Sequence, residues 1–438
     1  MQQLDNLISQ SSDMHEQPKN WSVVRLDSCL QENLRNGLYK PSEFLGKGQA
    51  KLVEISTLYN CDRILDVNHS LKAIEISEDE ERRYALQDND VLINRVSKRQ
   101  EGVAQARLVR ISQTWKQPVV FESNMLIARF DAEQISPDFF SFYASTGSYL
   151  TQVLSKAQKA NQTSINQQAL SSILLPRPPL PEQCAIAHTL RTIQKAKEAR
   201  QRELELERER KAALMQYLFT HGTRNEPRKK TEIGEIPQSW DVVPVGKICD
   251  SIVPGRNKPK RFGGDIPWIT IPDIRGKTKV EASLSGLAVS KEVLAEAGGR
   301  IIPSGSVIMS CVGNFGITSI AGRDLVINQQ LHAFICPEYL DAYFLSHALQ
   351  RQKSYMEAIA MVTVVAYLSK DKCNSVPIPL PSPDEQKEIT QILIACDTKI
   401  TALEQEAVFL DELFRAMLEE LMTGRLSALP LVEEEALN

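Results

Sequence analysis

Seven lysine and arginine residues gather in one short part of the C-terminal half of this 438-residue chain, between Arg256 and Lys279. Only two acids, Asp265 and Asp273, lie among them. Basic side chains anchor phosphates, and an arginine, asparagine or glutamine that reaches a base edge adds sequence preference. A merely solvated loop accounts for any single one of these residues, so the prediction rests on the group. Its members are Arg256, Lys258, Lys260, Arg261, Arg275, Lys277 and Lys279.

A thinner basic group occurs in the N-terminal half, in what the sequence indicates to be corresponding loops. Occurrence in both halves favours a shared phosphate-binding role over chance. The run from Arg200 to Lys211 differs, because its mixed charges are typical of a solvated or subunit-facing helix. The N-terminal candidates are Lys40, Lys47, Lys51, Arg95, Lys98 and Arg99.

The overall composition limits what these loops can mean. The chain is 42% hydrophobic and 24% charged, which is typical of two or three globular domains, and its formal net charge is -4. Any basic surface must therefore be local and balanced elsewhere, in part by the acidic tail after Pro430. The longest apolar run, Ala358 to Leu368, is too short to cross a membrane, so we expect a cytosolic protein with no membrane partner.

Signals for catalysis in this chain are missing. The eight cysteines are scattered singly without C-x-x-C, so neither disulfides nor a metal site is predicted. There is no glycine-rich nucleotide fingerprint, no phosphate loop, and no N-P-P-[FY] or D-P-P-[FY] of amino-methyltransferases. We predict no catalytic residue and no cofactor in this chain, and interpret His332, on a strand-like run, as a packed or hydrogen-bonded histidine.

Two long helices are predicted to position the basic loops. Residues from Pro181 to Gly222 contain no internal glycine or proline, and residues from Pro381 to Gly424 repeat the design at an offset of 203. Each helix would be about 60 Å long. In the second copy Ser382 and Glu385 predict a capping box that fixes the helix start.

The apolar residues of the second helix follow the steps of four and three that form a coiled-coil seam. The first helix has Lys197, Arg200, Glu207 and Lys211 at equivalent seam positions. It is either a solvated helix held only at its ends, or a helix that pairs with its copy and offers charge to another subunit, and we favour the second reading. The predicted pairing residues are Ile186, Leu190, Ile193, Leu204, Leu214, Leu218, Ile389, Leu393, Ile400, Leu403, Leu410, Phe414, Met417 and Leu421.

Collinear matches extend the repeat to the whole chain. Trp21 matches Trp240, residues 37–41 match residues 255–259, and residues 90–92 match residues 306–308. The offsets decrease along the chain from 219 to 216. A proline-rich joint precedes each helix. The predicted fold is α+β, with two strand-rich mixed domains in a pseudo-two-fold repeat, separated by two long antiparallel coiled-coil helices. The boundaries are 1–175 for the first domain, 176–222 for joint and helix, 223–375 for linker and second domain, 376–424 for the second joint and helix, and 425–438 for the tail.

Four short sequences give these domains a family resemblance: residues 263–268 (GGDIPW), 303–308 (PSGSVI), 327–329 (INQ) and 378–381 (IPLP). The chain resembles the specificity subunits of type I restriction-modification systems. The resemblance implies two target-recognition domains, each reading half of a bipartite double-stranded DNA target, with helices that set the spacing and dock two methyltransferase subunits. It places S-adenosylmethionine in those partners, and leaves open whether restriction and translocase subunits take part. The first domain departs from the pattern, with Asn89-Asp90 where glycine is usual and no G-G-D-I-P-W.

A second class of function remains open at this point. A non-enzymatic coiled-coil scaffold, with two globular domains that bind proteins or ligands such as carbohydrate, would suit the acidic net charge. The duplicated signature strands and the basic loops favour the DNA reader. Because counterion release makes DNA affinity fall steeply with salt, a flat salt response would favour the scaffold.

Overall fold

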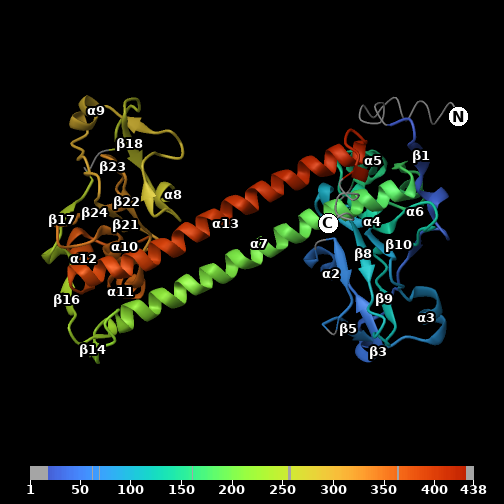
Figure 1. The fold of residues 1–438 in the computed structure, drawn as a ribbon, viewed down its shortest axis with the longest axis horizontal. Helices are drawn as coiled ribbons and strands as arrows, with labels where there is room; N and C mark the ends of the chain where they lie inside the picture. The colour runs from blue at the N-terminus through green and yellow to red at the C-terminus, as the bar shows by residue number, and fades with distance from the viewer. Residues whose placement is uncertain are drawn as a thin grey trace. The chain divides into compact units, whose positions relative to one another are not determined.

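The chain contains two long helices, α7 (Leu180–His221) and α13 (Pro383–Thr423) (Figure 1). The computed structural model describes residues 18–61, 63–68, 70–159, 161–254, 258–362 and 365–430, apart from the side chains of Asn60 and Glu101. The chain divides into unit 1, residues 1–201 with 405–438, and unit 2, residues 202–404. Each unit therefore contains one half of each long helix.

Unit 1 is built on a five-stranded sheet in the order β2-β10-β6-β8-β4, in which only the β4–β8 pair is parallel. Two three-stranded sheets, β5-β3-β9 and β11-β12-β7, and the pair β1-β13 surround it. Its strands are β1 (Ser22–Arg25), β2 (Arg35–Asn36), β3 (Leu45–Val53), β4 (Ile64–Asp66), β5 (Lys72–Ile74), β6 (Val91–Asn94), β7 (Val96–Ser97), β8 (Ala106–Arg110), β9 (Val119–Phe121), β10 (Met125–Ala128), β11 (Gln158–Lys159), β12 (Thr163–Ser164) and β13 (Leu174–Arg177). Its short helices are η2 (Leu26–Cys29), η3 (Ser42–Phe44), α2 (Ile55–Asn60), α3 (Glu78–Tyr84), η4 (Gln100–Gly102), α4 (Pro137–Tyr143), α5 (Gly147–Lys156) and α6 (Gln167–Ser171).

Unit 2 repeats this plan with a five-stranded sheet in the order β17-β24-β21-β22-β19, in which only the β19–β22 pair is parallel. Its strands are β14 (Arg228–Thr231), β15 (Gly234–Pro237), β16 (Asp241–Pro244), β17 (Asp250–Ile252), β18 (Ile266–Ile269), β19 (Lys279–Val280), β20 (Ala288–Val289), β21 (Val307–Ser310), β22 (Thr318–Ala321), β23 (Val326–Ile327), β24 (Leu331–Ile335), β25 (Met361–Val362), β26 (Ala366–Tyr367) and β27 (Pro377–Leu380). Its short helices are η5 (Val245–Lys247), α8 (Ile271–Ile274), α9 (Lys291–Glu296), α10 (Ala342–Arg351), α11 (Lys353–Ile359) and α12 (Lys370–Asn374).

The main sheets of the two units correspond, although unit 2 adds the β14–β15 pair and has only a single bridge at Val312 in place of β7, and this confirms the predicted α+β repeat. The central strands β6 and β21 are related by the offset of 216 seen in the sequence. Asn89, which precedes β6, has φ of 71°, and Gly305 at the matching place has φ of 85°. Asparagine tolerates the left-handed conformation better than most residues, so it can replace the expected glycine here.

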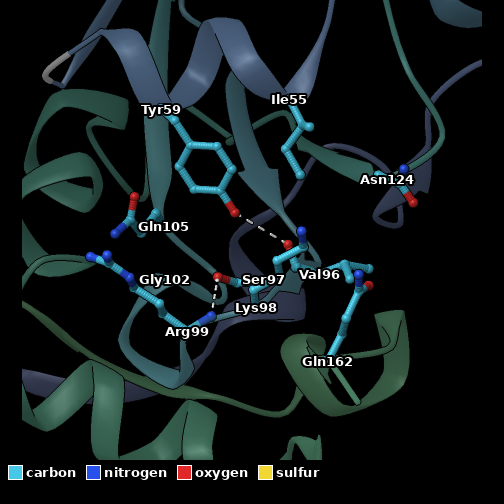
Figure 2. Close-up of a pocket in the computed structure, with 10 residues that line it drawn as sticks. All are labelled: Ile55, Tyr59, Val96, Ser97, Lys98, Arg99, Gly102, Gln105, Asn124 and Gln162. Carbon is cyan, nitrogen blue, oxygen red and sulfur yellow. Dashed lines mark hydrogen bonds between the residues drawn. The ribbon is translucent and has the colours of Figure 1, made fainter. Parts of the chain in front are cut away.

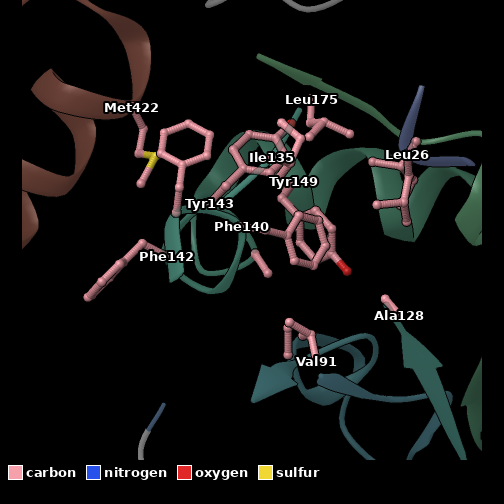
Figure 3. Packing of buried hydrophobic residues seen from close by; sticks show 14 of the residues in the cluster. Leu26, Val91, Ala128, Ile135, Phe140, Phe142, Tyr143, Tyr149, Leu175 and Met422 are labelled. Atoms are coloured by element: carbon pink, nitrogen blue, oxygen red, sulfur yellow. The ribbon is translucent and has the colours of Figure 1, made fainter. Parts of the chain in front are cut away.

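Each half-helix pair packs into the core of its own unit. In unit 1, Phe140, Tyr143 and Tyr149 lie in one buried cluster with Ile186 of α7 and Met422 of α13 (Figure 3). In unit 2, the fully buried Trp240 and Phe344 cluster with Phe219 of α7 and Ile389 of α13. Burial of large apolar side chains is the main stabilising term, so the helix ends are integral to each unit.

The proline-rich segments before the helices are strands rather than free joints. β13 pairs antiparallel with β1, placing Pro176 opposite Val23, and β27 pairs with β16, placing Pro377 opposite Pro244. Both ladders have only two strands. Proline lacks an N–H but is tolerated where one side of a strand needs no partner, which explains why a proline-rich sequence is not a flexible joint here.

Candidate nucleic-acid interface

The same buried hydrogen bond anchors the start of each long helix. Trp21 donates through its indole N–H to Glu182 at 3.0 Å, and Trp240 donates to Glu385 at 2.9 Å. All four side chains are buried. Glu385 also accepts the backbone N–H of Thr223 at 2.8 Å, just beyond the end of α7. The glutamates thus connect the sheet side of each unit to its helices.

The neighbouring glutamines repeat a second buried contact. The side chain of Gln183 accepts the N–H of Ser136 at 2.8 Å and donates to the carbonyl of Pro178 at 2.8 Å. Gln386 accepts the N–H of Asp341 at 2.8 Å and donates to the carbonyl of Pro381 at 3.0 Å. The Glu-Gln pair of each helix therefore joins the helix start to the adjoining chain on both sides.

The predicted capping box at the second helix is only half formed. Ser382 accepts the N–H of Glu385 at 3.4 Å, as expected for an N-cap serine. The carboxylate of Glu385 does not return to Ser382, because Trp240 and Thr223 occupy it. A long-range contact thus replaces the local one that the sequence suggests.

Charged residues along α7 pair with α13 within each unit. In unit 1, Lys197 pairs with Asp411, and Arg200 pairs with Glu406 at 2.8 Å. In unit 2, Lys211 pairs with Asp397 at 2.5 Å, Arg208 with Glu404 at 2.6 Å, and Lys399 with Glu207 at 3.4 Å. The partners on α13 move backwards as α7 advances, so the pairing is antiparallel. The four charged seam residues of α7 are thus engaged by α13.

The predicted helix-pairing residues are all shielded from solvent to some degree. Nine are buried and five are half-buried. The buried ones are Ile186, Leu190, Leu204, Leu218, Ile389, Leu393, Leu403, Phe414 and Leu421, and the half-buried ones are Ile193, Leu214, Ile400, Leu410 and Met417.

The basic candidates of unit 1 differ in availability. Lys40 pairs with Glu80 at 2.6 Å, and this hydrogen bond holds the pKa of the Glu80 carboxyl below its usual range. Lys51 donates to the carbonyl of Leu71 at 3.3 Å. Arg95 is half-buried, whereas Lys47, Lys98 and Arg99 are exposed. The last three are the cations best placed to meet a phosphate or a base.

The basic candidates of unit 2 form a more open set. Arg256 lies outside the described residues, and the other six are exposed. Asp273, one of the two acids among them, is buried and turned inward. Burial acts to raise its pKa, but hydrogen bonds from Thr270, Leu284 and Ser283 outweigh this and hold the pKa below its usual range. Its charge is therefore used to cap α8, leaving the basic surface less neutralised than the sequence suggests. The exposed cations are Lys258, Lys260, Arg261, Arg275, Lys277 and Lys279.

The sequence predicts that the second basic loop of each unit, residues 95–99 and residues 275–279, occupies the same place in the fold. This prediction is wrong. Arg95 follows β6 as Cys311 follows β21, so Lys98 and Arg99 match Asn314 and Phe315. Arg275 and Lys277 of unit 2 follow α8 rather than the central strand. The two units hence present their charge from different loops of one framework.

A pocket of about 550 Å³ opens beside Lys98 and Arg99 in unit 1 (Figure 2). Figure 2 shows Arg99 and Gln105 on one side of the pocket, and Asn124 and Gln162 on the other. Sequence analysis missed these amides and Tyr59, since the amides come from separate loops and Tyr59 comes from α2. The lining residues are Ile55, Tyr59, Val96, Ser97, Lys98, Arg99, Gly102, Gln105, Asn124 and Gln162.

Other chemistries find little support in the described part of the chain. Within it, no group of histidine, cysteine and acidic residues is arranged to hold a metal ion, and no helix has the length and apolar character to span a membrane. His332 is buried against Phe334, and burial lowers its pKa to about 4. It is therefore a neutral, packed side chain at physiological pH.

Comparisons with known proteins agree with this arrangement. A family model described as the type I restriction modification DNA specificity domain matches residues 18–208 and 237–408. The "Putative type I restriction enzyme MjaX specificity subunit" of Methanocaldococcus jannaschii is 25% identical over 425 residues, covering 95% of this chain and 96% of the relative. In fold, the chain resembles the solved type I restriction-modification S subunit of M. genitalium, with a TM-score of 0.57, 14% identity and coverage of 93% and 97%. Because the family model matches both repeats and most of the chain, the protein belongs to the family of type I restriction-modification specificity subunits, with two recognition domains in tandem.

Proposed function

We propose that this chain reads a bipartite double-stranded DNA target, with unit 1 and unit 2 each recognising one half. The observation that carries the proposal is the duplication itself. Both units keep the Trp–Glu and Gln contacts that fix the helices, yet they present their exposed basic residues from different loops of that framework. A shared framework with two different surfaces suits a protein that reads two different sequences.

Methyl transfer belongs to partner subunits in this proposal. The sequence lacks the methyltransferase signatures, so S-adenosylmethionine would bind to two methyltransferase subunits and not to this chain. Restriction and translocase subunits would join where the system contains them. This chain supplies recognition alone and is not itself an enzyme.

Exposed apolar residues on the long helices support docking of those partners. Leu206 of α7 is 65% exposed, and Phe409 of α13, its match at the offset of 203, is 66% exposed. Val408 and Leu413 lie exposed near Phe409. Contiguous exposed apolar side chains mark interaction surfaces, as Val408, Phe409 and Leu413 do here. Two equivalent positions fit two copies of one partner.

Docking is tested by Leu206→Glu and Phe409→Glu, made separately and together. Copurification with a methyltransferase subunit of the same system should fall from two copies to one in each single variant, and to none in the double variant. Leu284→Glu, at an exposed leucine of unit 2 away from the helices, is the matched control. Retention of two copies by the double variant would exclude this surface.

The two helices are also proposed to set the spacing between the half-sites. They contain 42 and 41 residues. At about 1.5 Å per residue, each spans about 60 Å, longer than the core of a single small domain requires. A change in helix length should therefore change the number of unspecified base pairs.

A heptad insertion tests the spacing. Seven residues added after Leu204 and after Ala407 keep the 3.5-residue seam and lengthen each helix by about 10 Å. Methylation mapping should show both half-sites unchanged and the gap wider by about one to three base pairs, with weaker methylation because each added pair rotates one half-site. An unchanged gap in an active variant would leave the helices as a docking platform only.

A further inference from the structure

A β-hairpin occupies the same place in both units. In unit 1, β12 pairs with β7, setting Ser164 opposite Val96. In unit 2, Tyr367 of β26 bridges to Val312. The next backbone contact also matches, since Ile165 donates to the carbonyl of Arg95 at 2.9 Å and Leu368 donates to that of Cys311 at 2.8 Å. The hairpins β11–β12 and β25–β26 can therefore be compared residue by residue.

Their side chains differ throughout. Gln158, Lys159 and Gln162 of unit 1 stand where unit 2 has Met361, Val362 and Val365. All three of these apolar residues are exposed, and Val362 is 79% exposed. Arg99 of unit 1 matches Phe315, which is buried. The Trp–Glu and Gln contacts that fix the helices are alike in the two units. The hairpin positions are exposed and carry no such shared contact, so their change from polar to apolar points to a role other than folding.

In unit 1, hydrogen bonds hold the loop that carries Arg99. Asn94 is buried, and its amide donates to the carbonyl of Gly102 at 2.6 Å and to the hydroxyl of Tyr59 at 3.2 Å. Ser97 accepts the N–H of Arg99 at 3.2 Å, as Figure 2 shows. A Cβ on Gly102 would lie 2.4 Å from the Ser97 hydroxyl, so a larger residue there would force the Ser97 side chain to shift. The loop that carries Arg99 is thus held in place before any ligand arrives.

Arg99 and Gln162 have polar ends with no hydrogen-bond partner among the described residues. Both are exposed, and both line the 550 Å³ pocket together with the anchored ring of Tyr59. Arginine and glutamine are the side chains that bind purine edges through paired hydrogen bonds, to guanine and adenine respectively.

We propose that this pocket reads purine edges in the half-site of unit 1, with Arg99 and Gln162 as the specificity-determining residues. The inference rests on the proposed function, because it requires that unit 1 meet DNA. It assigns base reading to the hairpin and the β7 loop, and leaves phosphate contacts to exposed cations outside the pocket. The matching hairpin of unit 2 has apolar Met361, Val362 and Val365 at the equivalent described positions, so unit 2 should read its half-site differently.

The experiment maps methylation by the complex of this chain with its methyltransferase partners, for Arg99→Ala and Gln162→Val. Gln162→Val installs the residue of unit 2. Each variant should relax one position of the unit 1 half-site, reducing discrimination there about 10- to 100-fold, as loss of a bidentate base contact implies. The unit 2 half-site should remain unchanged and shows that the complex is folded.

Lys159→Ala is the matched control, since it removes a cation from the same hairpin outside the pocket lining. It should weaken methylation at all sites without changing the sequence read. Full discrimination retained in both pocket variants would overturn the inference, as would a changed unit 2 half-site. A parent complex with no sequence preference would overturn the proposed function itself, and this is visible before any variant is made.

Discussion

Units 1 and 2 share one sheet topology but differ in the polar residues buried at it. In unit 1, Asp90 is buried at the start of β6 and binds Arg129 through two hydrogen bonds of 2.8 Å. The matching residues of unit 2 are Ser306 and Ile335, which form no ion pair. Leu126 of unit 1 likewise matches His332 of unit 2. The fold therefore depends on the strand framework and on the Trp–Glu contacts at the helix starts, whereas the buried polar residues differ between the two units.

The largest effect is expected from breaking the ion pair of unit 1. Arg129→Ile leaves Asp90 buried without its partner and should destabilise unit 1 by about 3–5 kcal/mol. Adding Asp90→Ser reproduces the residues of unit 2 and should recover most of that loss, because a buried pair replaced as a whole costs little. Hydrogen exchange of the β6 amides measures the stability of unit 1. If the double variant were no more stable than Arg129→Ile, the serine and isoleucine of unit 2 would not be an equivalent replacement for the Asp90–Arg129 ion pair.

His332 should make unit 2 sensitive to acid. Burial lowers its folded-state pKa to about 4, whereas the unfolded chain binds a proton near pH 6.5. Stability is therefore complete above about pH 6.5, falls as pH drops towards 4, and levels off below it, with a total loss of roughly 3 kcal/mol.

His332→Leu, the residue of unit 1, should remove this contribution. The difference in unfolding free energy between parent and variant, followed by hydrogen exchange of the β24 amides from pH 7 to pH 4, gives the test. Parallel pH profiles would show that His332 is not held neutral by burial.

The two helix anchors should differ in strength. Glu385 accepts from both Trp240 and the Thr223 backbone, whereas Glu182 accepts from Trp21 and, at 3.4 Å, from Ser427. Besides the tryptophan N–H in each unit, Glu385→Ala leaves the part-buried Thr223 N–H unpaired, whereas Glu182→Ala leaves only the hydroxyl of the exposed Ser427, so the cost to unit 2 should exceed the matching cost to unit 1 by about 1–3 kcal/mol. Chemical denaturation with exchange probes in each unit provides the measurement. Equal costs would mean that the Thr223 contact contributes nothing.

The smallest effect is expected for the ion pairs between the helices. Lys211→Ala removes the half-buried pair with Asp397 and should cost about 0.2–1 kcal/mol, as partly exposed pairs do. Lys197→Ala at Asp411 in unit 1 is the comparison. A loss above 2 kcal/mol for either would indicate that these charges, rather than the apolar seam, hold the helices together.

Local sequence signals predicted the long helices and the repeat, because helix ends and apolar periodicity depend on neighbouring residues. They also placed Glu385 at a helix start, but only as part of a local capping box. The bonds of Glu182 and Glu385 to Trp21 and Trp240 span 161 and 145 positions and follow from tertiary packing. The pocket was missed for the same reason.

Basic candidates were the least predictable, because exposure depends on partners that are distant in sequence. The sequence gives no reason to separate Lys40 from Lys98, but in the structure Lys40 pairs with Glu80. In unit 2, the inward turn of Asp273 could not be read from its position among the basic residues.

The most direct test of independent reading is an exchange of one unit's recognition surface. Residues 22–170 are replaced by the matching segment of a relative with a different target, and the methylated sites of the resulting complex are sequenced. We expect the unit 1 half of the target to change to that of the donor, while the unit 2 half and the gap between them stay as in the parent. A change in both halves, or in neither, would contradict this expectation.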